Sequence, residues 1–279
     1  MNVGIVIQRP AQLIGVDPFY PALIAGVEQV LSETEYALVL RVVNNDEAEA
    51  RSYERLAVQG RVDGFILTDV RRHDPRFRVV GGLGVPAVAL GPAPRSCPFP
   101  VVGPDDHATS RSMVRHLLEL GHRRIAHVSG PPWYEHSQAR RKGWREALME
   151  AGVQPDAEVP GDFTAAGGEA STRALLDTSD PPTAIFYAND LMAIAGLAVA
   201  ADRTVRIPED LSIAGYDEIS LSAHMSPPLA TVSRDNQLWG QMAARALIDQ
   251  IEGRPVPQRI LVESRVIVRG SIGPVPSRR

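Results

Sequence analysis

Polar side chains that can hydrogen-bond to hydroxyl groups recur in this sequence directly after short apolar runs. They are Gln8, Arg9, Thr68, Asp69, Tyr134, His136, Asn189, Asp190, Asp217 and Glu218. Amides and hydroxyls both donate and accept hydrogen bonds, whereas carboxylates accept them and guanidinium groups donate them. This combination favours a site that binds a small polar molecule.

Motifs for cofactor, metal or covalent chemistry do not occur. Neither Gly-rich phosphate loop, GxGxxG or GxxxxGK[S/T], is present. The 7 histidines show no HxxxH spacing and no pairing with the single Cys97, so we expect no metal site and no cofactor. Asp105, Asp106, His107 and Asp217 could carry acid–base chemistry. No nucleophile elbow accompanies them, and we expect no enzyme.

The elements that must position these residues alternate between strands and helices. In the first part of the chain, apolar runs predict strands at Val3–Ile7, Tyr36–Val42, Gly64–Leu67 and Ala87–Leu90. Helical patterns separate them at Pro21–Ser32, Glu47–Gln59 and Pro75–Gly81. Alternation of this kind predicts a parallel sheet with helices on both faces.

The same alternation then restarts. Strands are predicted at Ile125–Ser129, Thr183–Tyr187, Leu211–Tyr216 and Arg259–Val268. Helices are predicted at Ala108–Leu120, Arg140–Ala151, Gly167–Leu176, Asp190–Ala201 and Leu238–Glu252, the fourth with Asn189 or, as we favour, Asp190 as its N-cap. Ligands of open parallel sheets bind beyond the carboxyl ends of the strands, which is where the polar residues listed first fall.

Composition limits the class of protein. The chain has 279 residues, a net charge of −4 and a pI of about 6.0, whereas a DNA-binding surface is normally basic. No apolar run is long enough for a transmembrane helix, and the N-terminus reads as a strand rather than a signal peptide. We therefore expect a cytoplasmic protein that does not itself hold a DNA duplex.

A series of motifs, in order along nearly the whole chain, resembles the lactose-repressor (LacI/GalR) family of transcription regulators. They include VDGFIL at 62–67, HLLELGHRRI at 116–125, RRKGW at 140–144, PTAIF at 182–186 and AND at 188–190, then PEDLSI at 208–213, GYD at 215–217 and PLATV at 228–232. Asp17-Pro18-Phe19-Tyr20 resembles the family's entry to its first helix, although Asp17 stands where Asn is usual.

The resemblance implies an α/β fold of the type I periplasmic-binding-protein kind. Two similar Rossmann-like lobes with parallel sheets would be joined by three crossovers. The first lobe would comprise residues 1–104 plus 236–263, and the second 105–235 plus 264–279. The family carries a helix-turn-helix headpiece before its first strand. Because a strand begins here at Val3, the headpiece is absent, either because the chain is trimmed to the effector-binding core, as we expect, or because it is a relative that has no headpiece.

The resemblance also implies which residues bind the effector in a cleft between the lobes. Arg140, at the start of its helix, would clamp two hydroxyls or a carboxylate, and Asp217 would accept from adjacent hydroxyls. Asn189 would both donate and accept. Phe19, Tyr20 and Phe163 would pack on the apolar face of a sugar, with Phe19 and Tyr20 alternatively stapling the first helix. Further candidates are Tyr134, His136, Asn236, Gln8 and Asp69.

The resulting hypothesis is a ligand-sensing domain that binds a sugar or sugar derivative and controls operator binding allosterically. The expected partners are a second copy of the chain and, through the headpiece, operator DNA. The alternative is a solute-binding protein of a sugar transporter, which shares the fold but would carry an export signal. Gly91 and Tyr134 depart from residues seen in sugar-binding relatives, so the identity of the effector cannot be transferred.

Overall fold

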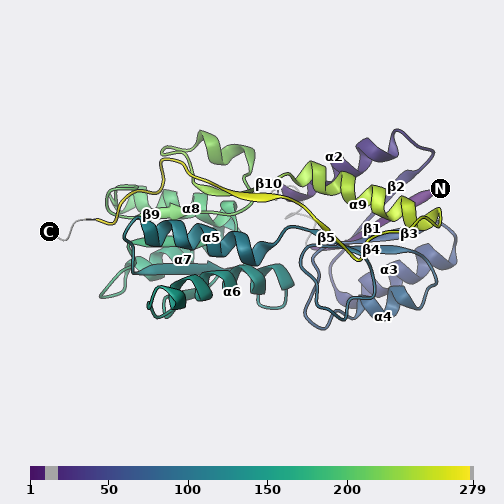
Figure 1. The fold of residues 1–279 in the computed structure, drawn as a ribbon, viewed down its shortest axis with the longest axis horizontal. Helices are drawn as coiled ribbons and strands as arrows, with labels where there is room; N and C mark the ends of the chain where they lie inside the picture. Colours follow the sequence, from purple (N-terminus) through teal and green to yellow (C-terminus); the bar gives the residue numbers. More distant parts are fainter. Residues whose placement is uncertain (10–17, 277–279) are drawn as a thin grey trace. The chain divides into compact units, whose positions relative to one another are not determined.

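The computed structural model describes residues 1–9 and 18–276, so that Asp17 and the loop before it lie outside the described residues. The chain divides into two compact units (Figure 1). Unit 1 comprises Met1–Asp105 and Asp235–Glu263, and unit 2 comprises Asp106–Arg234 and Ser264–Arg279. Both Asp105 and Asp235 therefore belong to unit 1, and the chain passes between the units three times.

Unit 1 is built on a six-stranded parallel sheet with the strand order β11-β5-β4-β3-β1-β2. The strands are β1 (Asn2–Gln8), β2 (Ala37–Val43), β3 (Gly64–Leu67), β4 (Ala87–Leu90), β5 (Val101–Gly103) and β11 (Arg259–Leu261). The central strands are buried on both faces, which is why they read as continuous apolar runs. The strand order reverses between β1 and β3, and ligands of such sheets bind at this switch point.

Helices cover both faces of the unit 1 sheet. Helices α2 (Phe19–Leu31) and α9 (Asn236–Ile251) pack on Val3, Ile5 and Ile7 of β1. Helices α3 (Asp46–Val58) and α4 (Arg76–Gly81) pack on the opposite face, which includes Val6. Figure 1 shows α2 beside α9. Their backbones meet at two glycines, since a Cβ on Gly26 would lie 1.9 Å from the carbonyl oxygen of Gln237 and one on Gly240 would lie 2.2 Å from that of Leu23.

Unit 2 repeats the plan with a four-stranded parallel sheet in the order β7-β6-β8-β9. Its strands are β6 (Ile125–Ser129), β7 (Glu158–Pro160), β8 (Ala184–Tyr187) and β9 (Ser212–Ala214). Helices α5 (Asp106–Glu119) and α6 (Glu135–Glu150) form one core with the sheet, and α7 (Ala165–Leu176) and α8 (Asp190–Asp202) form the other. Here the order reverses between β6 and β8.

Two predicted elements differ from the structure by more than two residues at either end. The strand expected over Arg259–Val268 is two strands: β11 joins the sheet of unit 1, whereas β12 (Ser264–Ile267) pairs antiparallel with β10 (Thr231–Arg234) in unit 2. Helix α6 begins at Glu135 rather than Arg140, so Arg140 lies in its second turn and not at its start. The short strands β5, β7 and β10 were not predicted from the sequence.

Among the described residues, no helix combines the length and the apolar character that crossing a membrane requires.

Candidate functional site

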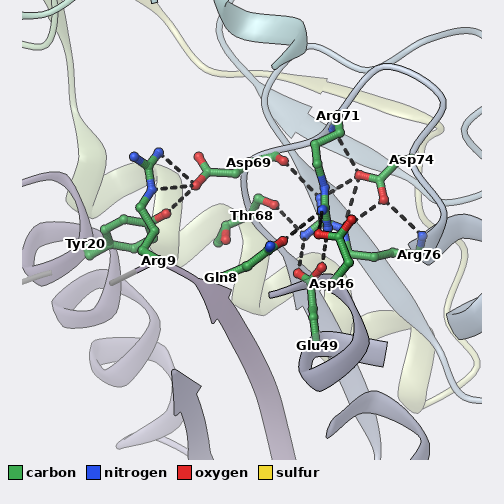
Figure 2. Close-up of polar contacts among 10 residues, drawn as sticks. All are labelled: Gln8, Arg9, Tyr20, Asp46, Glu49, Thr68, Asp69, Arg71, Asp74 and Arg76. Carbon is green, nitrogen blue, oxygen red and sulfur yellow. Dashed lines mark hydrogen bonds and ion pairs between the residues drawn. The ribbon is translucent and has the colours of Figure 1, made fainter. Parts of the chain in front are cut away.

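In unit 1, an aspartate at the switch point joins the ends of β1 and β3. Asp69 follows β3 and accepts a hydrogen bond of 2.5 Å from the Tyr20 hydroxyl and one of 3.0 Å from Nη2 of Arg9 (Figure 2). The backbone of Asp69 has φ 50°, a conformation that side chains other than glycine adopt at a cost. Burial raises the pKa of Tyr20 well above its ordinary value, and the carboxylate of Asp69 adds to that effect, so the hydroxyl stays protonated and donates.

A buried charge network holds the backbone of this aspartate in place. Arg76 donates from Nη1 to the carbonyl oxygen of Thr68 at 2.8 Å and from Nη2 to that of Asp69 at 3.0 Å. The same guanidinium pairs with the carboxylate of Asp74 at 2.6 Å. Figure 2 shows Arg76 among these partners together with Glu49 of α3, to which Nη1 also donates at 3.3 Å. Arg76 therefore positions Asp69 without belonging to the surface that Asp69 presents.

Gln8, at the end of β1, is held by the neighbouring arginine. Arg71 donates from Nη1 to Oε1 of Gln8 at 2.8 Å and to Oδ1 of Asp46 at 2.7 Å, and its Nη2 pairs with Glu49. The amide nitrogen of Gln8 is thereby directed away from Arg71, because the oxygen is engaged. Unit 1 thus brings three of the predicted residues, Gln8, Tyr20 and Asp69, to the carboxyl ends of its central strands.

In unit 2, Arg140 is buried at the carboxyl ends of the sheet. Its side chain is 2% exposed, and its Nε donates to Oδ1 of Asp106 at 2.7 Å. Nη1 donates to the carbonyl oxygen of Ala188 at 2.6 Å, and the guanidinium carbon lies 3.8 Å from the centre of the Tyr216 ring. Burial opposes the charge of Arg140, but Asp106 and Asp217 outweigh it and raise the pKa of the guanidinium.

Asp217 lies next to this arginine but not in hydrogen-bond contact with it. Its Oδ1 is 3.8 Å from Nη2 of Arg140, whereas Nη2 of Arg234 donates to the same oxygen at 2.7 Å. The backbone of Asp217 has φ 117°. Burial raises the pKa of Asp217, while the two arginines act in the opposite direction. Burial acts likewise on Asp106, but Arg140 and Arg234 prevail and lower its pKa.

Asn189 is buried at the end of β8, and its side chain has a structural role there. It is the N-cap of α8: its Oδ1 accepts from the backbone N–H of Met192 at 3.0 Å, and its Nδ2 donates to the carbonyl oxygen of Phe163 at 3.0 Å. The prediction that Asp190 caps this helix was wrong. Asp190 instead accepts from the hydroxyls of Ser222 and Thr231 inside the unit, because an extended N-cap at Asn189 places Asp190 within the helix.

Three of the predicted aromatic and imidazole rings form one stack beside Asn189. The ring of His136 lies 5.2 Å from that of Tyr134 and 5.4 Å from that of Phe163, with interplanar angles of 14° and 28°. Tyr134 ends the loop after β6 as the N-cap of α6, whereas His136 lies in the first turn of that helix. Phe163 has φ 69°, an unusual conformation for a large side chain.

Two predicted residues of unit 1 lie at the starts of helices. Phe19 opens α2 and packs against the rings of Tyr20 and Trp239, with centroid distances of 5.1 and 5.5 Å. Asn236 opens α9, and its Oδ1 is buried with no hydrogen-bond partner among the described residues. A buried acceptor of this kind is costly unless a ligand or water donates to it.

Sequence reasoning missed Arg234 and considered Asp106 only for acid–base chemistry. Arg234 ends β10, a strand too short to be recognised by its pattern, and Asp106 is the first residue of α5. Within the described residues, no three His, Cys, Asp or Glu side chains gather as metal ligands would. The arrangement in unit 2 is a compact set of two guanidinium groups and two carboxylates that can hydrogen-bond a polyhydroxylated molecule.

Comparison with known families gives the class of this fold. Residues 114–272 match a family described as the periplasmic binding protein-like domain. The chain is 35% identical over 276 residues to the HTH-type transcriptional regulator CelR of Thermobifida fusca, covering 97% of this chain and 81% of that protein. It is 32% identical over 259 residues to the ribose operon repressor of Escherichia coli K12, covering 91% and 78%.

Solved structures agree. The chain matches a complex of the transcriptional regulator CelR with cellobiose with a TM-score of 0.90 at 35% identity, covering 97% of this chain and 84% of that one. It matches a lac repressor dimer bound to operator with a TM-score of 0.88 at 26% identity, covering 97% and 81%. The fold is that of a periplasmic-binding-protein-like sensor. The chain belongs to the LacI family of transcriptional regulators and forms the effector-binding core of that family.

Proposed function

We propose that this core senses a carbohydrate and that the charged set around Arg140 in unit 2 binds the hydroxyl groups of that sugar. The class of ligand is supported by the relatives: one similar structure is a complex with cellobiose, and one similar protein is a ribose operon repressor. Their description as regulators favours a sensor over a solute-binding protein of a transporter.

The observation that carries the proposal is the gap between Arg140 and Asp217. Nη2 of Arg140 and Oδ1 of Asp217 are 3.8 Å apart, beyond the normal range of about 2.7–3.2 Å for such a hydrogen bond. A ligand hydroxyl beside this pair can accept from the guanidinium and donate to the carboxylate at once. Because Asp106, Ala188 and Tyr216 already fix the guanidinium, little side-chain freedom is lost on binding.

Neighbouring groups would complete the site. Asn189 lies beside Phe163, whose ring stacks with His136, and such rings pack against the C–H faces of sugars. In unit 1 taken by itself, Asp69 and Gln8 offer a carboxylate and an amide at the corresponding strand ends. Asp69, Phe163 and Asp217 all have positive φ, a form of strain that clusters at ligand-binding positions.

The experiment is a thermal-shift screen of cellobiose, ribose, other pentoses and hexoses, their phosphates, polyols and purines. A ligand present at 100 times its Kd stabilises the native protein by about 2.7 kcal/mol. Arg140→Ala would remove the guanidinium nearest to the buried Asp106, so the informative variants are Arg140→Lys and Asp217→Asn. Arg141→Ala is the matched control, because that neighbouring side chain is 40% exposed and pairs with Glu158.

We expect one sugar class to stabilise the native chain and Arg141→Ala alike, and to lose its effect in Arg140→Lys and Asp217→Asn. A shift that survives in both of these variants would refute the assignment of the site. A screen in which no carbohydrate binds, while a purine or another class does, would refute the proposed ligand.

We further propose that the chain acts as a homodimer in the cytoplasm and binds its effector without converting it. One similar structure is a dimeric lac repressor on its operator, and two-fold symmetric regulators suit palindromic operators. Effector and operator affinities would then be coupled reciprocally, with the operator read by the headpiece that this family carries. Light scattering should give twice the chain mass of 30.2 kDa, and chromatography of the incubated sugar should show no product. A monomer or a converted sugar would contradict these statements.

A further inference from the structure

A hollow that is separate from the proposed sugar site lies in unit 1 between β2 and the end of α3. Its volume is about 450 Å³, and its polar lining consists of Asn2, Arg41, Ser52, Arg55 and Arg61, with Gly60 at the turn. Asn2 is the first residue of β1, and Arg61 precedes β3. Gln8 ends β1 and Asp69 follows the end of β3, so the hollow lies at the opposite end of the sheet from these two residues.

The lining of this hollow is positively charged without compensation. It contains three arginines and no aspartate or glutamate. None of the ion pairs and side-chain hydrogen bonds found among residues 1–9 and 18–276 uses the guanidinium group of Arg41, Arg55 or Arg61. The carboxylate of Asp63, close in sequence, accepts a hydrogen bond of 2.5 Å from the backbone N–H of Asn2 and does not line the hollow.

A second groove on the molecule shows how such a surface is normally neutralised. The groove between α5 and α6 is also lined by three arginines, but it contains Glu119 and Glu150 as well. There Arg111 forms a bidentate pair with Glu150, with Nη2 at 2.7 Å from both carboxylate oxygens. The hollow beside β2 lacks this compensation. Like charges gathered in one concavity repel one another, and a bound anion removes that repulsion.

We propose that the hollow beside β2 binds a phosphoryl group, either as inorganic phosphate or on a small phosphorylated metabolite. Guanidinium groups match the geometry of phosphate oxygens and bind them through paired N–H donors. The volume falls within the range of about 300–1,000 Å³ that small-molecule sites occupy. The arginines project from three separate segments, namely β2, α3 and the turn before β3, so that they can surround one anion.

The backbone of the turn is held in a form that leaves room for the anion. Nδ2 of Asn2 donates to the carbonyl oxygen of Arg61 at 2.9 Å, which ties the turn to β1. Gly60 has φ 60°, and a Cβ placed there would meet nothing within 4 Å. The Ser52 hydroxyl donates to the carbonyl oxygen of Ala48 at 2.7 Å, which fixes the floor of the hollow.

Isothermal titration calorimetry at constant ionic strength tests the proposal. The probes are inorganic phosphate, glucose 6-phosphate and glucose, and the variants are Arg41→Gln/Arg55→Gln and Arg61→Gln. Arg78→Gln is the matched control, since it removes an exposed arginine of unit 1 that does not line the hollow. Asp217→Asn separates this site from the proposed sugar site. A duplex DNA of arbitrary sequence forms a further arm, and circular dichroism confirms that each variant is folded.

We expect phosphate and glucose 6-phosphate to bind the native chain. Their affinities should be at least about tenfold weaker in Arg41→Gln/Arg55→Gln, which corresponds to about 1.4 kcal/mol, whereas any binding of glucose should be unchanged by these substitutions. The Arg78→Gln and Asp217→Asn proteins should bind phosphate as the native chain does. Comparing the two phosphate probes tells free phosphate from a phosphorylated metabolite. Equal phosphate affinity in all proteins, equal loss in Arg78→Gln, or binding of the DNA with none of the phosphate probes would each overturn the proposal.

Discussion

Replacing Arg76 by methionine should destabilise unit 1 more than any loss of one surface charge. The side chain of Arg76 is 4% exposed, and its partners Asp74 and Glu49 are 0% and 2% exposed. Methionine fills similar space but removes every side-chain donor. The carboxylate of Asp74 then loses its ion pair and keeps only two backbone N–H donors. The carbonyl oxygens of Thr68 and Asp69 lose the bonds from the guanidinium. Breaking a buried pair in this way costs about 3–5 kcal/mol.

A second substitution separates the effect of losing the buried ion pair from the effect of losing packing. Asp74→Asn in the Arg76→Met background removes the uncompensated charge, so it should restore at least about 1 kcal/mol. Arg78→Met is the control, since this arginine of the same short helix is exposed and surface substitutions usually change stability by less than about 0.5 kcal/mol.

Urea unfolding followed by circular dichroism measures the free energy, and hydrogen exchange of residues 64–81 locates the change in unit 1. The reasoning is refuted if Arg76→Met costs less than about 1 kcal/mol, or if Asp74→Asn does not improve it.

The effect of Arg76 should also depend on pH with a definite sign. Burial acts to raise the pKa of Asp74, but its bonds to Arg76 prevail and hold that pKa below its ordinary value. A carboxylate with a lowered pKa stabilises the fold above its unfolded value of about 3.9, and this contribution is lost as the pH falls through the folded pKa. The difference between the native chain and Arg76→Met should therefore shrink below about pH 4.

Two further substitutions test the packing and the buried charge. Gly26→Ala should destabilise unit 1 by at least about 1–3 kcal/mol, because the new Cβ would lie 1.9 Å from a backbone oxygen of α9; Gly81→Ala, which meets nothing within 4 Å, is its control in thermal melts, and equal melts would contradict the close approach of α2 and α9. Asp190→Asn should remove a pH dependence, because burial, reinforced by Asp217, raises the pKa of Asp190 to about 6. A raised carboxyl pKa gives stability that is fully present below about pH 3.9 and lost as the pH rises through the folded value. As the pH is lowered from 7 to 5, the melting temperature of the native chain should thus rise relative to that of Asp190→Asn. A difference that stays constant over this range would argue against a titrating Asp190.

The parts of the fold that could be predicted from sequence are those whose own pattern carries the information. The strands β3, β4 and β6 have the bounds predicted for them, because each is a short apolar run buried on both faces. Strands β5 and β7 have three residues each, and only pairing with a longer neighbour defines them. The division of Arg259–Val268 into two strands was hidden because the passage between units at Glu263 and Ser264 carries no turn signal.

The residues of the candidate site could likewise be predicted only in part from the sequence. Arg140, Asn189 and Asp217 were proposed from motifs, and the structure places all three at the carboxyl ends of strands in unit 2. Their pairing with Asp106 and Arg234 could not be foreseen, since residues so far apart in sequence meet only in the folded unit. The early start of α6 was missed because Glu135–Ala139 has no apolar periodicity, and buried Ser137 and Arg140 face the core instead.

The path of the chain between the units sets an order for folding during synthesis. Helix α9 supplies Trp239, Ala243 and Leu247 to the core of unit 1, yet it is made only after residues 106–234. At about 5–20 residues per second, the ribosome needs on the order of ten seconds for that segment. While that segment is made, the face of the first sheet that α9 will cover lacks this helix. All four strands of the second sheet are complete before α9 is synthesised. Unit 1 therefore closes its core only once α9 is made, and unit 2 in turn is completed later still, by β12 and by Ile272 of its core.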